Sequence, residues 1–287
     1  MKIALCVSGN LGFSIFFHLL DSGANIACIF TDKQSKNIIE QAVQHNIPYF
    51  IGNPRKGRAY QFISKYSVDI LLSVNYLFLF DEDVINWPRK FAINVHGSLL
   101  PKYRGRTPHV WAIINNEEKT GITAHLIDDG CDTGPLVKQF EICIGKQDTG
   151  GSILEKYSEK YPVLLSDVLH SIERGTINPM PQDESKATYF GKRTPDDGEI
   201  NWYWQKERIR NWVRAQALPY PGAFTWVGQE KMIIDEIAFD DTGFHSDIPN
   251  GTVLSLSPVR VKTPNGVIRI EKDRGIPETL RVNQRLG

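Results

Sequence analysis

The sequence predicts an α/β fold: a Rossmann-like, mostly parallel sheet, followed by a small antiparallel β-domain. Over the first half of the chain, short apolar runs alternate with helix-like stretches, which is the order of a doubly wound parallel sheet. Past residue 200 this alternation gives way to one short amphipathic helix and several strands joined by turns. The length of 287 residues is sufficient for two domains, each with its own core.

Apolar runs mark the strands expected in the first domain. These strands are expected at residues 3–7, 25–31, 69–74, 92–96, 120–127 and 136–144. Helical patterns lie between or after them, at residues 13–20, 35–45 and about 152–173. Pro162 is expected to kink or divide the last of these helices, because proline lacks a backbone N–H.

The pattern after residue 200 indicates a second, smaller domain. A helix is expected at residues 206–217, with Ile209, Trp212 and Val213 on one side. Strands are expected at residues 223–227, 232–239, 252–256, 259–262 and 267–271. Asn265-Gly266 is a strong hairpin signal between the last two strands. We therefore expect a catalytic domain at 1–185, a connecting segment at 186–200 and a small β-rich domain at 201–287.

Composition argues against several classes of protein. Lysine plus arginine number 33, as do aspartate plus glutamate, so the chain has no overall positive charge for nucleic acid. The four cysteines form no C-x-x-C pair and the histidines lack metal-ligand spacing, which favours reduced thiols and no metal. The start of the chain lacks a signal-peptide pattern, and no apolar run reaches the roughly 18 residues of a membrane span. We therefore expect a cytoplasmic protein that binds neither nucleic acid nor membrane.

Three polar side chains in two separated segments suggest an active site. Asn94 and His96 stand two residues apart in an expected strand, so they point to the same face, and Gly97 then turns the chain. A second apolar run ends in a loop that carries Asp132. If the two runs are neighbouring parallel strands, Asn94, His96 and Asp132 converge at the strand ends, where open α/β sheets bind ligands.

These three groups suit acyl transfer to an amine. A neutral imidazole such as His96 can take a proton and later return it, because its unperturbed pKa is about 6.5. The Asn94 amide can donate to a carbonyl oxygen that becomes negative, and losing such a donor typically costs roughly 100- to 1000-fold in rate. Asp132 can fix the imidazole tautomer and stabilise its charged form.

Each residue also has a plain structural interpretation. A strand histidine is often a satisfied core residue, an aspartate in a Gly-rich turn often stabilises the turn, and a strand asparagine can bond to the backbone. Ser98 lies two residues after His96, but no G-x-S-x-G elbow surrounds it, so no serine nucleophile is indicated. The spacing alone leaves both interpretations open.

The residues around the trio resemble the folate-dependent formyltransferases. Asn94-Val-His96, the following Ser98-Leu-Leu-Pro101 and Asp132-Thr-Gly-Pro135 match that family's active-site pattern in order and spacing. The resemblance implies the formyltransferase fold. It also implies transfer of a formyl group from 10-formyltetrahydrofolate to a primary amine, with Asn94, His96 and Asp132 as the catalytic set.

Two later segments resemble one branch of this family. Residues 188–198 and 213–224 are similar to the enzymes that formylate amino sugars on nucleotide carriers. The resemblance implies a small-molecule nucleotide sugar as acceptor, with dTDP-4-amino-4,6-dideoxyglucose the first choice, for O-antigen or other surface polysaccharide, including lipopolysaccharide. It also implies a homodimer formed through the C-terminal domain.

The resemblance assigns a folate cleft to two segments. Residues 73–80 align with the family segment whose main chain reads the pterin edge, and residues 127–130 form the opposite wall. The implied cofactor-binding residues are Tyr76, Phe78, Phe80, Ile127, Asp128 and Asp129.

The acceptor contacts come partly from chemistry and partly from the resemblance. A cationic loop beside the reaction centre suits a diphosphate, because guanidinium pairs bidentately with phosphate oxygens; a solvated surface loop is the alternative. The resemblance places Ser8-Gly9-Asn10 beside the sugar or phosphates, although a tight strand-to-helix turn would need the same residues. The expected substrate-binding residues are Ser8, Gly9, Asn10, Lys102, Arg104, Arg106 and Arg193.

Other functions remain open at this point. The same trio would serve a methionyl-tRNA formyltransferase, against which the balanced charge argues, or a 10-formyltetrahydrofolate hydrolase. A non-catalytic nucleotide-sugar binding protein would not need the trio. A dinucleotide-dependent dehydrogenase is disfavoured, because the G-x-G-x-x-G fingerprint would need glycine at Val7.

Overall fold

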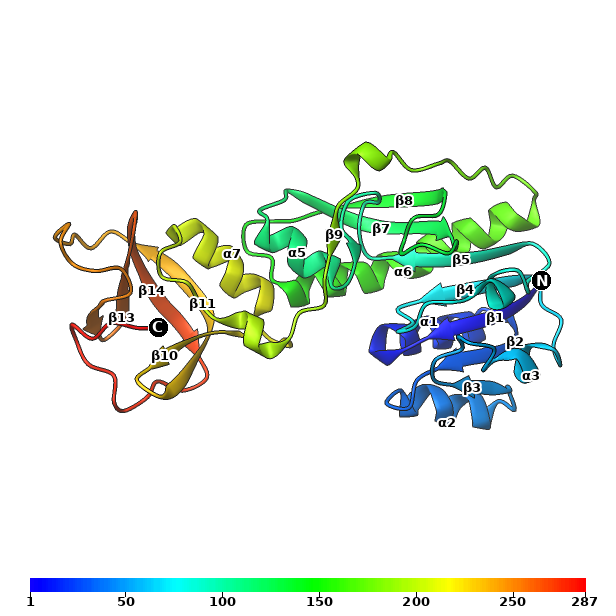
Figure 1. Cartoon of the computed structure of the whole chain (residues 1–287), viewed down its shortest axis with the longest axis horizontal. Coiled ribbons are helices and arrows are strands. Elements are labelled where there is room, and N and C mark those ends of the chain that lie inside the picture. The colour runs from blue at the N-terminus through cyan, green and yellow to red at the C-terminus, as the bar shows by residue number, and fades with distance from the viewer. The chain divides into compact units, whose positions relative to one another are not determined.

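The computed structural model describes residues 1–287, and its contacts divide the chain into two compact units. The first unit contains residues 1–105, 120–142 and 156–190, and the second contains 106–119, 143–155 and 191–287. Each unit is assembled from separate stretches of chain, so the division cannot be compared directly with the domain boundaries expected at residues 185 and 200. Those boundaries stay predictions. Figure 1 labels most of the elements of both units.

A seven-stranded sheet forms the frame of the first unit, in the order β3-β2-β1-β4-β5-β7-β8 (Figure 1). Its strands are β1 (Lys2–Val7), β2 (Asn25–Thr31), β3 (Tyr49–Ile51), β4 (Ile70–Val74), β5 (Phe91–His96), β7 (Lys119–Leu126) and β8 (Leu136–Cys143). The pairs from β3 through β5 are parallel, which confirms the Rossmann-like, mostly parallel sheet. The pair β5–β7 is antiparallel, so the parallel arrangement considered for these two strands is wrong.

Helices connect and cover these strands. They are α1 (Gly9–Asp21), α2 (Lys36–Gln44), α3 (Tyr60–Ile63), α4 (Glu82–Ile85) and α6 (Gly150–Glu173). Helix α1 packs against β1, β2, β4 and α2. Pro162 does not divide α6, which continues through it. Buried side chains on both sides of the proline, Tyr157 and Leu165 among them, hold the helix against the core at that point.

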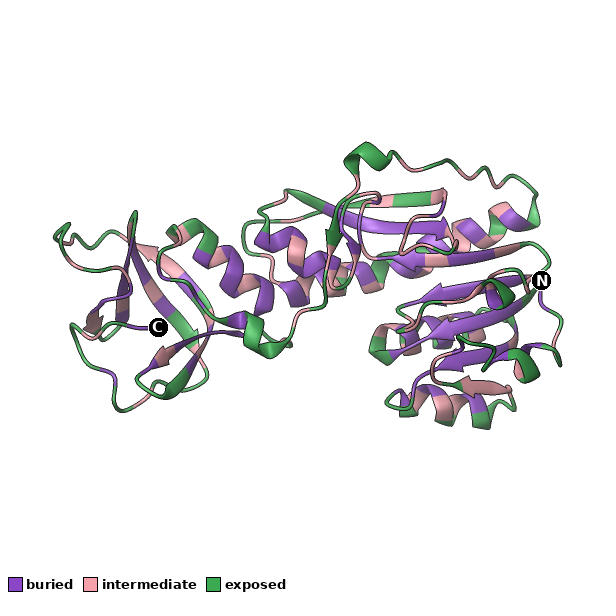
Figure 2. Ribbon diagram, viewed as in Figure 1, coloured by how far each residue is buried: buried purple, intermediate pink, exposed green.

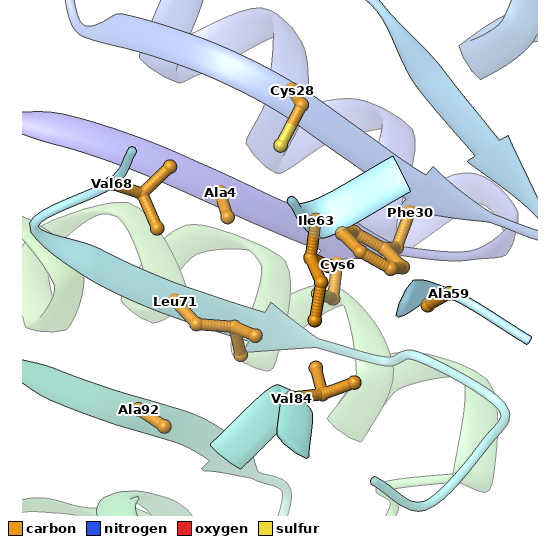
Figure 3. Packing of buried hydrophobic residues seen from close by; sticks show 10 residues of the cluster. All are labelled: Ala4, Cys6, Cys28, Phe30, Ala59, Ile63, Val68, Leu71, Val84 and Ala92. Carbon is orange, nitrogen blue, oxygen red and sulfur yellow. The ribbon is translucent and has the colours of Figure 1, made fainter. Parts of the chain in front are cut away.

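One face of the sheet buries a core cluster, which Figure 3 shows from close by. Its residues are Ala4, Cys6, Cys28, Phe30, Ala59, Ile63, Val68, Leu71, Val84 and Ala92. The members from β1 and β2 alternate along their strands, as the period of two requires for side chains on one face. Phe30 lies at the centre of an aromatic group, with ring centroids 5.4 Å from those of Phe50 and Phe62. The central strands are buried along most of their length (Figure 2), as expected for apolar parallel strands.

The second unit contains an antiparallel sheet of five strands in the order β10-β11-β14-β13-β12, as predicted. The strands are β10 (Ala223–Val227), β11 (Glu230–Asp240), β12 (Val253–Leu256), β13 (Val259–Thr263) and β14 (Gly266–Asp273). Helix α7 (Lys206–Gln216) packs on β11 and on α5 (Pro108–Ile114). The predicted hairpin joins β13 to β14, where Thr263 pairs with Gly266.

The remaining elements are short. Strands β6 (Arg104–Gly105) and β9 (Tyr189–Phe190) pair in parallel within the first unit. Two 3-10 turns, η1 (Glu184–Lys186) and η2 (Pro195–Gly198), complete the description. None of the helices combines the length and the apolar character that crossing a membrane would require.

Candidate functional site

The pairing of β5 with β7 brings two histidines and an asparagine together. Asn94 is directly opposite His125, and His96 is opposite Thr123. The Asn94 Nδ2 atom lies 3.1 Å from His125 Nε2. Sequence reasoning missed His125, because only the register of the two strands reveals that it faces Asn94.

The loop after β7 folds back and carries Asp132 to this pair. Leu126 N donates to Pro135 O at 2.9 Å, which closes the loop. A Cβ atom on Gly134 would lie 1.9 Å from Leu126 O, so only glycine fits where the chain returns. Asp132 itself has φ 58, a left-handed conformation that is uncommon for residues other than glycine. The convergence expected from parallel strand ends is therefore produced by a returning loop.

The structure brings Asn94, His96 and Asp132 into one cluster. Asp132 Oδ2 lies 3.4 Å from His96 Nδ1, and Asp132 Oδ1 lies 3.4 Å from Asn94 Nδ2. Asp132 Oδ1 is also 3.5 Å from His125 Nε2. The exposed fractions of the His96 and Asp132 side chains are 8% and 13%. The catalytic role of the trio stays a prediction, and this cluster supplies the geometry that it requires.

Neighbouring carbonyl groups fix the tautomers of both histidines. His96 Nε2 lies 2.8 Å from Tyr103 O, and a carbonyl only accepts, so the neutral ring carries its proton on Nε2. The lone pair of His96 is then on Nδ1, facing Asp132. His125 Nδ1 lies 2.7 Å from Leu126 O in the same way, so its Nε2 accepts from Asn94. This chain of contacts fixes the orientation of the Asn94 amide.

Asp132 is held in its charged form. Burial alone would raise the pKa of its carboxyl, but the positive charge that His96 carries when it is protonated and the Gly105 N–H, 2.9 Å from Oδ2, hold this pKa well below its usual range. Because the unfolded chain has the higher pKa, near 4, it takes up the proton first as the pH falls. The stability contributed by Asp132 is therefore fully present above about pH 5 and is lost as the pH falls below about 4.

We expect this linkage to appear in the stability of Asp132→Asn, whose neutral amide imitates the protonated acid. At pH 7 the free energy of unfolding of the variant should be lower than that of wild type by on the order of 1–3 kcal/mol. The difference should shrink as the pH falls below about 4, because the unfolded wild-type chain takes up a proton there while the folded protein still holds the charge. Urea denaturation of both proteins across a pH series measures it, and a difference that grew towards acid would contradict the assignment.

The predicted folate segment lies beside the core cluster. Tyr76, Phe80 and Ile127 all pack against this cluster. The two predicted walls of the folate cleft, residues 73–80 and 127–130, therefore both contact the same core. The rings of Tyr76 and Phe80 stack with centroids 5.4 Å apart, and Tyr76 OH donates to Gly52 O at 2.8 Å. The main-chain groups of Phe78 and Phe80 make no hydrogen bond within the chain. Free main-chain donors and acceptors on a rigid aromatic segment fit a planar ligand with hydrogen-bonding edges.

The two aspartates of the opposite wall differ in what they contact. Asp128 Oδ1 accepts from Gly130 N at 3.2 Å and from Thr133 Oγ1 at 2.6 Å, so this carboxylate stabilises the loop that carries Asp132. Asp129 is exposed. The cofactor contact expected of each stays a prediction.

The turn Ser8-Gly9-Asn10 opens α1, where Asn75 Nδ2 donates to Ser8 O at 2.9 Å. The Gly9 N–H is taken by Ser35 Oγ at 2.8 Å, and Ser35 Oγ donates to Asp32 Oδ2 at 2.6 Å. Burial would raise the pKa of Asp32, but the hydrogen bonds that it accepts, first that from the Ser35 hydroxyl, lower it. An ionised carboxylate beside this helix N-terminus opposes a phosphate there, which favours the turn interpretation. The sugar contact of Ser8, Gly9 and Asn10 stays a prediction.

The four predicted cationic contacts are placed very differently. Lys102 and Arg106 are exposed. Arg104 is fully buried, and its guanidinium donates to Glu184, Gln182 and Tyr189; the phosphate contact expected of it stays a prediction, and it would have to compete with these partners. In the second unit, Arg193 lies between the indole rings of Trp111 and Trp212, 4.9 and 4.4 Å from their centroids. Arg193 also donates to Gln216 Oε1 at 2.7 Å, which ties it to its own unit.

A pocket of about 610 Å³ lies elsewhere, in the second unit. It is lined by residues 199–204 and 285–287, none of which was predicted to act. We place the chemistry at Asp132 instead, because titratable groups with matched partners gather there and not in this pocket. No three acidic, histidine or cysteine side chains gather in an arrangement that could hold a metal ion.

Comparison with known proteins gives two family matches and several similar structures. The formyl transferase model matches residues 1–169, and the formyl transferase C-terminal domain model matches residues 192–274. WlaRD, a sugar 3N-formyl transferase solved in the presence of dTDP and 5-N-formyl-THF, is 19% identical with a TM-score of 0.71, over 96% of this chain and 99% of that one.

Two further structures are similar to the chain. The N-formyltransferase from Helicobacter canadensis, in complex with folinic acid and dTDP-3-aminofucose, is 19% identical with a TM-score of 0.73, over 94% of this chain and 99% of that one. A 4-N formyltransferase from Francisella tularensis is 22% identical with a TM-score of 0.66, over 78% and 91% of the two chains. At such identities these likenesses show a shared fold.

Proposed function

The chain belongs to the formyl transferase family, and on that premise we propose that it transfers the formyl group of 10-formyltetrahydrofolate to the amine of a nucleotide-linked amino sugar. The observation that carries the proposal is the cluster of Asn94, His96 and Asp132, in which one carboxylate contacts both an amide and an imidazole. An amide donor, a proton acceptor and a carboxylate are the groups that acyl transfer to an amine requires.

The residues around Phe78 suit the folate. The bound co-substrate would supply the formyl carbon, and the free main-chain groups of Phe78 and Phe80 would bind the edge of its planar ring system. Tyr76 and Ile127 would close the cleft on either side, since both pack against the core cluster. Asp128 and the exposed Asp129, both on the loop between Ile127 and Asp132, are the remaining proposed contacts.

The protein groups have separate tasks in the proposed reaction. Asn94 donates from Nδ2 to the carbonyl oxygen as the amine adds to the formyl carbon, and that N–H is released from its long 3.4 Å contact with Asp132. His96 takes the proton that the amine loses on Nδ1, the nitrogen with a free lone pair, and returns it to the departing nitrogen. Asp132 stabilises the imidazolium during the interval in which His96 holds the proton.

The acceptor is the finer part of the proposal. We propose dTDP-4-amino-4,6-dideoxyglucose, as a precursor of O-antigen or a related surface polysaccharide. Its support is the similarity of residues 188–198 and 213–224 to sugar-nucleotide enzymes, together with the dTDP ligands named for two of the similar structures. Lys102 and Arg106, both exposed, and Arg193 stay the cations proposed for the diphosphate. The homodimer and the cytoplasmic location stay predictions.

The proposal is tested by incubating the protein with 10-formyltetrahydrofolate and a panel of dTDP- and UDP-linked amino sugars, and measuring product mass. The expected result is one added formyl group on a dTDP-4-amino sugar. Formylation of methionyl-tRNA alone, or formate release without an acceptor, would replace the proposal with the transfer RNA enzyme or the hydrolase. Tight binding of a dTDP-sugar without turnover would indicate a binding protein.

A further inference from the structure

The buried cation Arg104 lies next to the proposed active site and has no role in the reaction described above. None of its side chain is exposed, although arginine is rarely buried unless it is paired. Its Nη2 donates to Glu184 Oε1 at 2.5 Å and to Gln182 Oε1 at 2.8 Å, while Nε donates to Gln182 Oε1 at 3.2 Å. The hydrogen bond to Glu184 raises the pKa of Arg104 further, so the guanidinium is permanently charged.

The residues on either side of Arg104 contact the two proposed proton-handling groups. The carbonyl of Tyr103 accepts from His96 Nε2 at 2.8 Å. The N–H of Gly105 donates to Asp132 Oδ2 at 2.9 Å. A shift of this tripeptide would therefore disturb His96 and Asp132 at the same time.

The backbone of this tripeptide needs an anchor. Tyr103 has φ 60 and Gly105 has φ 100, both outside the ordinary region. Gly105 lies so close to β9 that a Cβ atom would be 2.3 Å from Phe190 O. Such conformations persist only where the surroundings hold them, and the side chain of Arg104 lies at the centre of those surroundings.

A second connection leads from the same arginine to Asp132. Gln182, whose Oε1 accepts from Arg104, donates from Nε2 to Asp132 O at 2.9 Å and to Gly134 O at 2.7 Å. Arg104 thus holds the Asp132 backbone through Gln182 and the Asp132 carboxylate through the neighbouring Gly105 N–H.

We propose that Arg104 is a positioning residue for catalysis: its buried guanidinium, held by Gln182 and Glu184, fixes the His96 tautomer and the direction of the Asp132 carboxylate. The inference rests on the proposed function of the same site. It replaces the diphosphate contact expected from the sequence. A plain structural role is the alternative, and it would change the stability of the protein without changing the state of the His96 ring.

The test uses Arg104→Lys, which keeps the charge but loses the planar fork that reaches both partners. We expect kcat to fall roughly 10- to 100-fold, with the KM values for both substrates changed less than about threefold, because misplacing catalytic groups affects the chemical step. Arg104→Ala should regain part of its kcat in millimolar guanidinium. Lys186→Ala, on the exposed side of the same η1 turn, is the matched control and should retain wild-type kcat.

A second measurement does not depend on activity. The ring-nitrogen NMR signals of His96, assigned by their loss in His96→Ala, should report the neutral ring protonated on Nε2 in wild type. In Arg104→Lys we expect a mixture of both tautomers, because Tyr103 O is no longer fixed. This measurement needs no substrate. It can therefore contradict the positioning role of Arg104 even if the proposed reaction is correct, and can support that role even if the proposed reaction is wrong.

Several outcomes would overturn the inference. An unchanged His96 tautomer in Arg104→Lys would leave only a structural role. A raised KM for the nucleotide sugar with unchanged kcat would return Arg104 to the diphosphate contact. If Arg104→Lys does not fold, Glu184→Gln serves in its place. Glu184 is 65% exposed, and the glutamine removes the negative charge but can still accept a hydrogen bond from Arg104, which also keeps Gln182. Wild-type kcat and tautomer in that variant would equally contradict the proposal.

Discussion

Asp132→Asn is expected to reduce kcat by about 1,000- to 10,000-fold, the size of effect seen when the acid of a catalytic triad becomes an amide. The variant has nearly the same shape, so the loss would come from chemistry. The neutral His96 ring has its lone pair on Nδ1, 3.4 Å from Asp132 Oδ2. An amide at that position can donate to Nδ1 and occupy the lone pair, and it cannot stabilise an imidazolium.

Single-turnover formyl transfer at saturating concentrations of both substrates measures this effect. Asp167→Asn is the matched control, because Asp167 is a half-exposed carboxylate whose ion-pair partner, Lys138, is 3.4 Å away on the surface. The control should transfer formyl at the wild-type rate. A kcat for Asp132→Asn within about tenfold of wild type would mean that the carboxylate is not needed in the chemical step.

His96→Ala is expected to lose about 100- to 10,000-fold in kcat, the contribution of a positioned acid–base group. His96 is the proposed proton carrier, and the neighbouring His125 cannot replace it because both of its ring nitrogens are engaged. His125 Nδ1 donates to Leu126 O, and His125 Nε2 accepts from the Asn94 amide. The loss should therefore be large although a second imidazole is a neighbour.

Added imidazole should restore part of the activity of His96→Ala, because the substitution leaves a cavity of the same shape beside Asp132. His170→Ala, which removes an exposed histidine near the end of α6, is the control and should be indistinguishable from wild type. Near-normal turnover by a folded His96→Ala protein would refute the assignment of His96.

Much of the fold could be predicted because its signals are local. The runs at β1, β2 and β4 are mostly apolar, as expected of strands covered on both faces, and their expected bounds agree with the observed ones within about one residue. Short elements such as β3 and α3 were missed, because three or four residues are too few to show a period. The direction of β7 was not predictable, since a buried run looks the same whichever way it crosses the sheet.

The site was only partly predictable for a related reason. The positions of Asn94 and His96 two residues apart, and the loop with Asp132, are visible in the sequence, so their proximity could be anticipated. The role of His125 depends on strand register, and the burial of Arg104 depends on a contact 80 residues away, at Glu184. Chemistry alone indicated a phosphate ligand at Arg104, because exposure cannot be read from a cationic loop.

We propose that the cluster around Asp132 moves a formyl group to a sugar amine. The most direct measurement mixes the protein with 10-formyltetrahydrofolate carrying a carbon-13 formyl group and dTDP-4-amino-4,6-dideoxyglucose, and follows the label by NMR. Wild type should give a formamide signal on the sugar, and Asp132→Asn should give almost none. A label that stayed on the folate with every amino sugar, or moved equally fast with the variant, would contradict it.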